Sequence, residues 1–393
     1  MGTYERLGVR RIVNASATLT RLGGSVMPPV VREAMVDGAG AFVDLVELQR
    51  AVSREIARLT HNDAAYVPSG AAAGLVLVTA ALITGTDESK VAALPLPEGP
   101  KHEVLIHACQ RFGYDFAVRS VGVHLREFGP PRAPGSATTL ADLEAAFSDR
   151  TLYVLYLAGL KSERGALPVE DVIRSAHDHG IPVVVDAAAQ LPPAENLWHY
   201  TRDLGADLAI FSGGKGLCGP QPTGLVLGRP DIIEGIYPNA VPNARIGRPM
   251  KVGKEELCGI LAAVEWYLSR DEPATLRRYE EVVQLFVEGL SGLPGVVAER
   301  DYPSEAGQPH PRCLVTVDPA VARVTRDDLM QCLWEGEPRI AVAAAPDGGI
   351  WATLRPSSGG TVRQKQGIWL NPQTLADGEE LIVLRRLREV LGG

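Results

Sequence analysis

Two short segments of the sequence end in residues whose side chains could do chemistry together. The aliphatic run at 183–185 ends in Asp186, and the run at 209–211 is followed by Ser212, two glycines and Lys215. Burial at a strand end lowers the pKa of a lysine and leaves a nucleophilic neutral amine. A buried carboxylate nearby suits a protonated heteroaromatic nitrogen. Together the two segments indicate a pyridoxal phosphate site, with Lys215 forming the Schiff base and Asp186 holding the pyridinium nitrogen.

A third segment has the features of a phosphate site. Ser69, Gly70 and Ala71 open an apolar helix with a hydroxyl and small residues, which leaves N–H groups at a helix N-terminus for an anion. Each segment also has an ordinary explanation: Lys215 as a surface lysine, Asp186 as a helix cap, and Ser69 as a cap of the apolar helix. The occurrence of all three in this order favours the cofactor site.

The elements around these residues alternate between short aliphatic runs and helical stretches. This alternation predicts an α/β fold with a mostly parallel sheet covered by helices on both faces. In such sheets, ligands bind at the carboxyl ends of the strands, where Asp186 and Lys215 fall. The predicted strands are 103–107, 124–127, 152–157, 182–186, 207–211 and 223–227, and the predicted helices between them are 70–83, 140–146, 169–179 and 196–204.

The pattern changes after about residue 250. A long helical stretch at 254–290 with a break near Pro273 is followed by a strand at 312–317 and a C-terminal helix at 377–391. The sequence therefore predicts three parts: an N-terminal segment (1–50) that contributes to the active site and the small domain, a large cofactor-binding domain (51–250) and a small α+β domain (251–393).

Composition excludes several classes of function. The 393 residues carry 39 Lys and Arg against 47 Asp and Glu, so the net charge of −8 does not favour general binding of nucleic acid. The longest apolar stretch, 71–83, is too short to cross a bilayer. Five cysteines without a CxxC pair indicate a reduced, cytoplasmic protein without a disulfide framework or metal site.

The chain resembles fold-type I pyridoxal phosphate enzymes of the selenocysteine synthase-like group, most closely the branch that includes D-glucosaminate-6-phosphate ammonia-lyase. This resemblance implies an aspartate aminotransferase-like fold, with a mostly parallel seven-stranded sheet sandwiched by helices and a smaller α+β domain. It also implies a homodimer or a higher oligomer with shared active sites. The segments that carry the resemblance are 12–25, 43–49, 68–74, 185–193, 211–221 and 246–255.

The resemblance assigns roles around the cofactor to particular residues. Lys215 and Asp186 would be catalytic, Ala188 would lie beneath the ring, and the stacked residue would be His107 or Gln110, the latter at a position where relatives often carry His. A core or surface histidine is the other interpretation of His107. The residues expected at the phosphate are Ser69, Gly70, Ala71 and Ser212, with Thr223 from the neighbouring subunit.

The same resemblance points to cationic residues for an anionic substrate. Arg21, Arg248 and Lys251 are the candidates, with Lys254 in the same cluster, and a solvated basic loop is the alternative. Cys218 and Ala343 stand where relatives have larger or basic residues. The stretch 346–367 looks like an insertion, from which Arg355 would replace an anion-binding arginine or which would form a lid.

These features predict an enzyme that forms a quinonoid from a small polar amino acid or amino sugar acid. Elimination by an ammonia-lyase is the leading hypothesis, and racemisation or epimerisation and transamination are the alternatives within the same fold. A non-catalytic pyridoxal phosphate-binding partner is a further alternative. Selenium transfer on aminoacyl-tRNA is disfavoured, because that group carries an additional N-terminal tRNA-binding domain, whereas the match in this chain begins near Asn14.

Overall fold

The computed structural model describes residues 2–160, 162–304, 306–345 and 367–392. It divides into two compact units, residues 25–270 and residues 1–24 with 271–393. The divisions therefore follow Gly24 and Arg270, whereas the sequence predicted boundaries at 50 and 250. Most of the segment 1–50 and the helix that begins at Lys254 thus belong to the larger unit.

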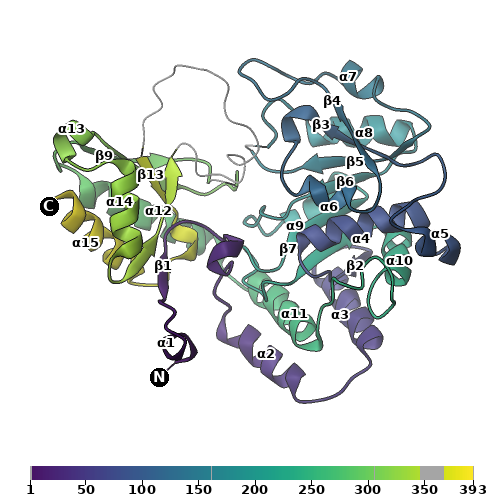
Figure 1. The fold of residues 1–393 in the computed structure, drawn as a ribbon, viewed down its shortest axis with the longest axis horizontal. Coiled ribbons are helices and arrows are strands. Elements are labelled where there is room, and N and C mark those ends of the chain that lie inside the picture. The colour runs from purple at the N-terminus through teal and green to yellow at the C-terminus, as the bar shows by residue number, and fades with distance from the viewer. Residues whose placement is uncertain (1, 161, 305, 346–366, 393) are drawn as a thin grey trace. The chain divides into compact units, whose positions relative to one another are not determined.

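The larger unit contains a seven-stranded sheet in the order β2-β8-β7-β6-β5-β3-β4 (Figure 1). Strands β3 to β7 run parallel, and β8 is antiparallel to both of its neighbours. The predicted mostly parallel α/β fold is confirmed. The strands are β2 (Ala64–Tyr66), β3 (Glu103–His107), β4 (His124–Phe128), β5 (Thr151–Leu157), β6 (Val183–Asp186), β7 (Leu208–Ser212) and β8 (Gly224–Gly228).

Helices cover both faces of this sheet, which explains why every residue of β3, β5 and β6 is buried. On one face lies α4 (Ala71–Thr84), whose Thr79 hydroxyl lies 2.8 Å from the Tyr153 hydroxyl of β5. On the other face, side chains of three helices share one apolar core with the sheet. These helices are α3 (Leu45–Leu59), α8 (Val169–Asp178) and α11 (Lys254–Leu268).

The remaining helices of the larger unit surround these layers, and α2 packs along α11. The segment 196–204, predicted as one helix, forms a short helix followed by a π-helical turn. The elements are α2 (Pro29–Ala39), α5 (Glu88–Ala93), η2 (Ala108–Gln110), α6 (Asp115–Arg119), α7 (Leu140–Glu144), α9 (Asn196–Trp198), η3 (His199–Asp203) and α10 (Pro230–Asn239).

The smaller unit is built on an antiparallel sheet in the order β12-β13-β10-β9, and β1 pairs in parallel with β11. Helices α12, α14 and α15 share its apolar core. Arg355 and the other residues at 346–366 lie outside the described residues. The elements are α1 (Thr3–Arg6), β1 (Ile12–Asn14), η1 (Thr20–Leu22), α12 (Glu272–Leu290), β9 (Val296–Asp301), β10 (Arg312–Val317), α13 (Pro319–Ala322), α14 (Arg326–Glu335), β11 (Arg339–Ala341), β12 (Ala343–Ala345), β13 (Gly367–Leu370), η4 (Pro372–Thr374) and α15 (Glu379–Leu391).

Within the described part of the chain, no helix combines the length and the hydropathy needed to span a membrane. The cytoplasmic location expected from the sequence stays a prediction.

Candidate active site

Asp186 and Lys215 lie at the carboxyl edge of the sheet: Asp186 is the last residue of β6, and Lys215 follows the neighbouring strand β7. Asp186 is buried, and burial raises the pKa of its carboxyl group. The Ala188 N–H, which donates to the carboxylate at 3.0 Å, and the positive charge of Lys215 both act in the opposite direction. The structure therefore places a desolvated carboxylate and a lysine that acts on it electrostatically at the ends of neighbouring strands.

Backbone hydrogen bonds from both neighbouring strands fix the position of Asp186. The Ala158 N–H donates to the Asp186 carbonyl at 3.0 Å, and the Ala187 N–H donates to the Ile210 carbonyl at 2.9 Å. Immediately beyond, the Ser212 N–H donates to the Ala188 carbonyl at 3.3 Å. The predicted residues Ala188 and Ser212 thus lie beside each other at the ends of β6 and β7.

The loop that carries Lys215 closes on itself. The Gly213 N–H donates to the Thr223 carbonyl and the Gly219 N–H donates to the Gly213 carbonyl, both at 2.8 Å. The Thr223 hydroxyl donates to the Pro220 carbonyl at 2.6 Å within the same loop. Thr223 is fully buried within its own chain, and its hydroxyl stabilises the closed form of this loop.

The N-terminus of α4 has the backbone geometry of an anion site. Gly70 precedes the helix at a φ of 96°, in the region that favours glycine. The first helical hydrogen bond runs from the Gly74 N–H to the Gly70 carbonyl. The N–H groups of 71–73 therefore lie in the first turn, where a helix offers them no partner of its own.

Close packing brings this helix start onto the sheet beside β7 and β8. A Cβ on Gly74 would lie 3.1 Å from Ile210 Cγ2 and 3.3 Å from Val226 Cγ2. A Cβ on Gly224 would lie 2.8 Å from the carbonyl carbon of Gly70 and 3.0 Å from the Ala71 nitrogen. Glycine at 224 therefore allows the α4 N-terminus to lie directly against β8.

His107 and Gln110 are both fully buried at the end of β3. The His107 Nε2 accepts a hydrogen bond from the Leu167 N–H at 3.2 Å, and its ring centroid lies 4.3 Å from that of Phe128. Burial lowers the pKa of His107 to about 4, so the ring is neutral. The Gln110 amide bonds with the backbone of Leu157 on both its nitrogen and its oxygen.

The predicted substrate residues differ in their surroundings. Arg248 and Lys251 are exposed in the loop before α11, whereas the Lys254 amine donates to the Gly38 carbonyl at 2.7 Å and helps to hold α2. Arg21 is exposed in η1 of the smaller unit. Arg355 lies outside the described residues.

Two further residues at this edge of the sheet were missed by the sequence reasoning. Arg132, after β4, donates to the Cys109 carbonyl at 3.1 Å and to the Ser162 carbonyl at 3.4 Å. Glu163, after β5, accepts from the Gly159 N–H at 2.9 Å, and burial raises the pKa of its carboxyl group. Both lie in loops that follow strands, a location that could have identified them from the strand pattern.

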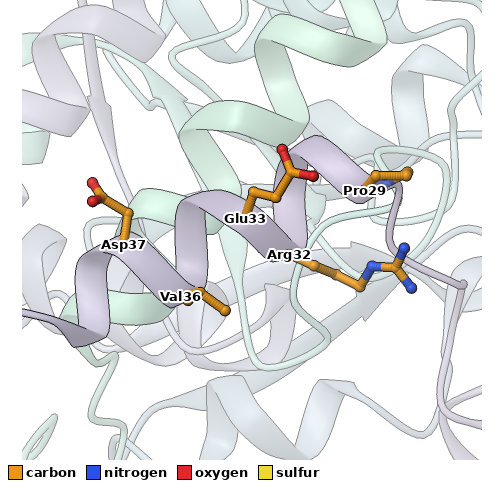
Figure 2. A pocket seen from close by; sticks show the side chains of 5 residues that line it. All are labelled: Pro29, Arg32, Glu33, Val36 and Asp37. Carbon is orange, nitrogen blue, oxygen red and sulfur yellow. The ribbon is translucent and has the colours of Figure 1, made fainter.

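A separate depression of about 370 Å³ lies along α2 and is lined by Pro29, Arg32, Glu33, Val36 and Asp37 (Figure 2). None of these residues was predicted to contact cofactor or substrate. This depression therefore lies apart from the candidate site at the strand ends and the α4 N-terminus.

Known proteins match the chain over most of its length. The family model described as aminotransferase class-V matches residues 100–247. D-glucosaminate-6-phosphate ammonia lyase of Salmonella typhimurium is 29% identical over 98% of this chain and 97% of its own length. A solved structure of a D-glucosaminate-6-phosphate ammonia-lyase covers 100% of this chain and 98% of its own, with a TM-score of 0.81 at 28% identity.

Two other relatives carry different names. The 5'-C-glycyluridine monooxygenase-decarboxylase of Streptomyces is 32% identical over 86% of this chain and 83% of its own length. An L-seryl-tRNA(Sec) selenium transferase of Desulfovibrio desulfuricans is 25% identical over 99% of this chain and 84% of its own length. The three kinds of relative differ in the reaction that they are named for.

Proposed function

Because the chain belongs to the fold-type I pyridoxal phosphate-dependent enzymes of the selenocysteine synthase-like group, we propose that it is an ammonia-lyase for a small anionic amino acid or amino sugar acid. Pyridoxal 5'-phosphate is the cofactor of this group. The observation that carries the proposal is the buried Asp186 carboxylate, which lies within the electrostatic influence of Lys215 at the end of a neighbouring strand. The named activity of the ammonia lyases among the relatives supports a lyase, and the substrate class is part of the proposal.

The described residues fit this cofactor chemically. Asp186 is a desolvated carboxylate that gains a partner if it meets a protonated ring nitrogen, and this would stabilise its charged form. The first turn of α4, entered through Ser69 and Gly70, would hold the phosphate, with Ser212 at the neighbouring strand end. Ala188 provides a small side chain beside the carboxylate.

The reaction requires a base near the substrate Cα and an acceptor for the electrons left there. When bound, pyridoxal phosphate supplies that acceptor. Lys215 would hold the cofactor, give way to the substrate amine, and then take the Cα proton on its Nζ. In a substrate with a hydroxyl at Cβ, Lys215 Nζ would pass that proton to the hydroxyl, which would leave as water. Addition of water would then release ammonia and a 2-keto acid. Asp186 would keep the ring nitrogen protonated throughout.

Cationic residues would orient the substrate. Arg248 and Lys251 are exposed on the loop before α11, and Arg21 is exposed in the smaller unit, so all three are accessible to an anion in the isolated chain. A guanidinium pairs with a carboxylate through two parallel hydrogen bonds. We include these three residues, and Arg355, as the proposed substrate contacts.

A homodimer with shared active sites is part of the proposal. The segment 26–43 exposes five large apolar side chains, which a second copy would bury. Light scattering of the purified protein tests this, and a mass of one chain would contradict it. The exposed apolar residues of the segment are Val26, Val30, Val36, Phe42 and Val43.

The function is tested by loading the purified protein with pyridoxal phosphate and adding amino acids and amino sugar acids of both configurations. The expected result is visible absorbance, a spectral change with some members, and release of ammonia with a keto acid. Borohydride followed by peptide mapping should label Lys215, and Lys215→Ala should abolish the label while Lys101→Ala, at an exposed site, retains it. A protein that takes up no cofactor would refute the proposal. An epimer as product would identify the enzyme as a racemase in place of a lyase, and a new amino acid would identify it as a transferase.

A further inference from the structure

The pairing between β3 and β5 ends before β5 does. Their parallel register runs as far as Ile106 opposite Leu155, and β3 stops at His107, where the chain turns into η2. Leu157 is the last residue of β5 and lies two positions beyond Leu155. Since alternate residues of a parallel strand direct their N–H and C=O to the same neighbour, the Leu157 backbone faces the side from which β3 has departed.

The side chain of Gln110 takes the place of the missing strand. Its Nε2 donates to the Leu157 carbonyl at 3.0 Å, and its Oε1 accepts from the Leu157 N–H at 3.0 Å. Gln110 is fully buried, so these bonds form away from water. A primary amide presents an N–H donor and a carbonyl acceptor side by side, which is the pattern that a strand backbone would present.

The opposite edge of the same strand end meets Asp186. Leu157 is in register with Asp186 between β5 and β6, and the Ala158 N–H donates to the Asp186 carbonyl at 3.0 Å. The end of β5 is therefore held between the Gln110 amide on one side and the Asp186 backbone on the other. A displacement of Leu157 would be transmitted directly to the strand that carries the buried carboxylate.

We propose that Gln110 is a positioning residue that fixes Asp186 through the end of β5, and that it does so by replacing the backbone of β3 with its amide. This inference rests on the proposed function of Asp186 as the partner of the cofactor ring nitrogen. It gives Gln110 a role through Leu157 in place of a direct stacking contact with the ring. The Gln110 side chain also interacts with His107. This interaction raises the pKa of His107, and the larger effect of burial lowers it.

The substitution Gln110→Glu provides a switch for this interaction. A protonated glutamic acid reproduces both bonds, because its hydroxyl donates to the Leu157 carbonyl and its other oxygen accepts from the Leu157 N–H. The ionised carboxylate has no donor and repels the Leu157 carbonyl. The variant should therefore bind pyridoxal phosphate as the parent does at low pH and lose affinity as the pH rises, whereas Gln110→Leu should be impaired at every pH.

The measurement is the dissociation constant of pyridoxal phosphate, from absorbance titration of the full-length protein between pH 6 and pH 9. Relative to the parent at each pH, the affinity of Gln110→Glu for pyridoxal phosphate should fall about tenfold or more as the pH rises across this range. An unmade hydrogen bond in a buried site commonly changes an equilibrium by that factor. Gln331→Glu, at an exposed position of α14, is the matched control and should follow the parent.

Hydrogen exchange of the cofactor-free protein provides a readout independent of the proposed function. Protection of the Leu157 and Ala158 amides should fall with rising pH in Gln110→Glu, after correction for intrinsic exchange, while protection of β7 stays at the parental level. If protection changes and cofactor affinity does not, the link from Gln110 to Asp186 is overturned. If neither changes and Gln110→Leu also matches the parent in both measurements, the strand replacement itself is overturned. A parent that binds no pyridoxal phosphate would instead refute the proposed function.

Discussion

The substitution Gly224→Ala tests whether the approach of α4 to the sheet creates the phosphate site. A Cβ at position 224 would lie 2.8 Å from the Gly70 carbonyl carbon, 2.9 Å from the Phe211 carbonyl oxygen and 3.0 Å from the Ala71 nitrogen. All three are backbone atoms, which cannot rotate away. Because ordinary contact begins near 3.4 Å, the start of α4 must move by about half an ångström relative to β8.

This movement should affect both the stability of the fold and the affinity for the cofactor phosphate. Overpacking a well-packed site costs about 1–3 kcal/mol of folding free energy. Hydrogen bonds between backbone N–H groups and a charged phosphate contribute about 1.5–3 kcal/mol each, and they require close alignment. Loss of one such bond corresponds to about a 10- to 100-fold increase in the dissociation constant, at 1.4 kcal/mol per factor of ten.

The assay is titration of cofactor-free protein with pyridoxal phosphate, alongside denaturation of each variant in urea. Gly235→Ala is a matched control, because its Cβ would also be crowded, at 3.2 Å from Ala81 Cβ, but within the contact between α10 and α4. The control should lose stability and retain cofactor affinity. If Gly224→Ala folds and binds the cofactor as tightly as the parent, the N-terminus of α4 is not the phosphate site.

Three further predictions concern titratable residues. Asp186→Asn should reduce the rate of keto acid release by about 10²-fold or more without lowering the free energy of unfolding of the cofactor-free protein, because burial already penalises the Asp186 charge. Burial lowers the pKa of His107 to about 4 from an unfolded value of about 6.5. The neutral ring therefore contributes its full share of the folding free energy above pH 6.5, and this share, about 3 kcal/mol in total, is lost as the pH falls toward 4. Urea denaturation at pH 7 and pH 5 should show a smaller decline for His107→Phe than for the parent. Asp207→Asn should destabilise the fold by about 1–3 kcal/mol and leave kcat unchanged, because this buried carboxylate accepts bonds from Val183, His177 and Arg229 at the amino ends of the strands.

The sequence predicted the carboxyl edge of the sheet well because the signals there are local. Aliphatic runs such as 183–185 are typical of strands buried on both faces, and the residue that ends each run must lie at the edge. The short strand β2 was missed, since three residues give no readable periodicity. The domain boundaries also differ, because the packing of α3 and α11 into one core depends on contacts between distant segments.

The roles of individual side chains were less predictable than the positions of the strand ends. Gln110 was one of two candidates, with His107, for the face of the ring, and the structure shows its amide bonded to the Leu157 backbone. Lys254 was grouped with Arg248 and Lys251 by charge alone, and its amine instead donates to the Gly38 carbonyl. In both cases, the partner is a backbone group far away in sequence, which residue type and spacing do not reveal.

The glycines around Lys215 show why a glycine-rich loop need not face a ligand. Glycines in such a loop could let the backbone approach a cofactor, but the space beside three of them is filled by protein. A Cβ at Gly213 would overlap Thr223 Oγ1. A Cβ would lie 2.6 Å from the Gln221 Cα at Gly214 and 2.6 Å from the Leu191 carbonyl oxygen at Gly216.

These positions therefore need glycine so that the loop can pack against itself and against the segment after β6. Tight packing limits the conformations of the backbone on either side of Lys215, because protein interiors leave little room for displacement. A lysine side chain is long and flexible, so a rigid backbone is what restricts the region that its amine can reach. The glycines around Lys215 would then serve the chemistry indirectly, by holding the lysine beside Asp186. Gly70 differs, because the open space beside it and its φ of 96° leave the backbone available to an anion.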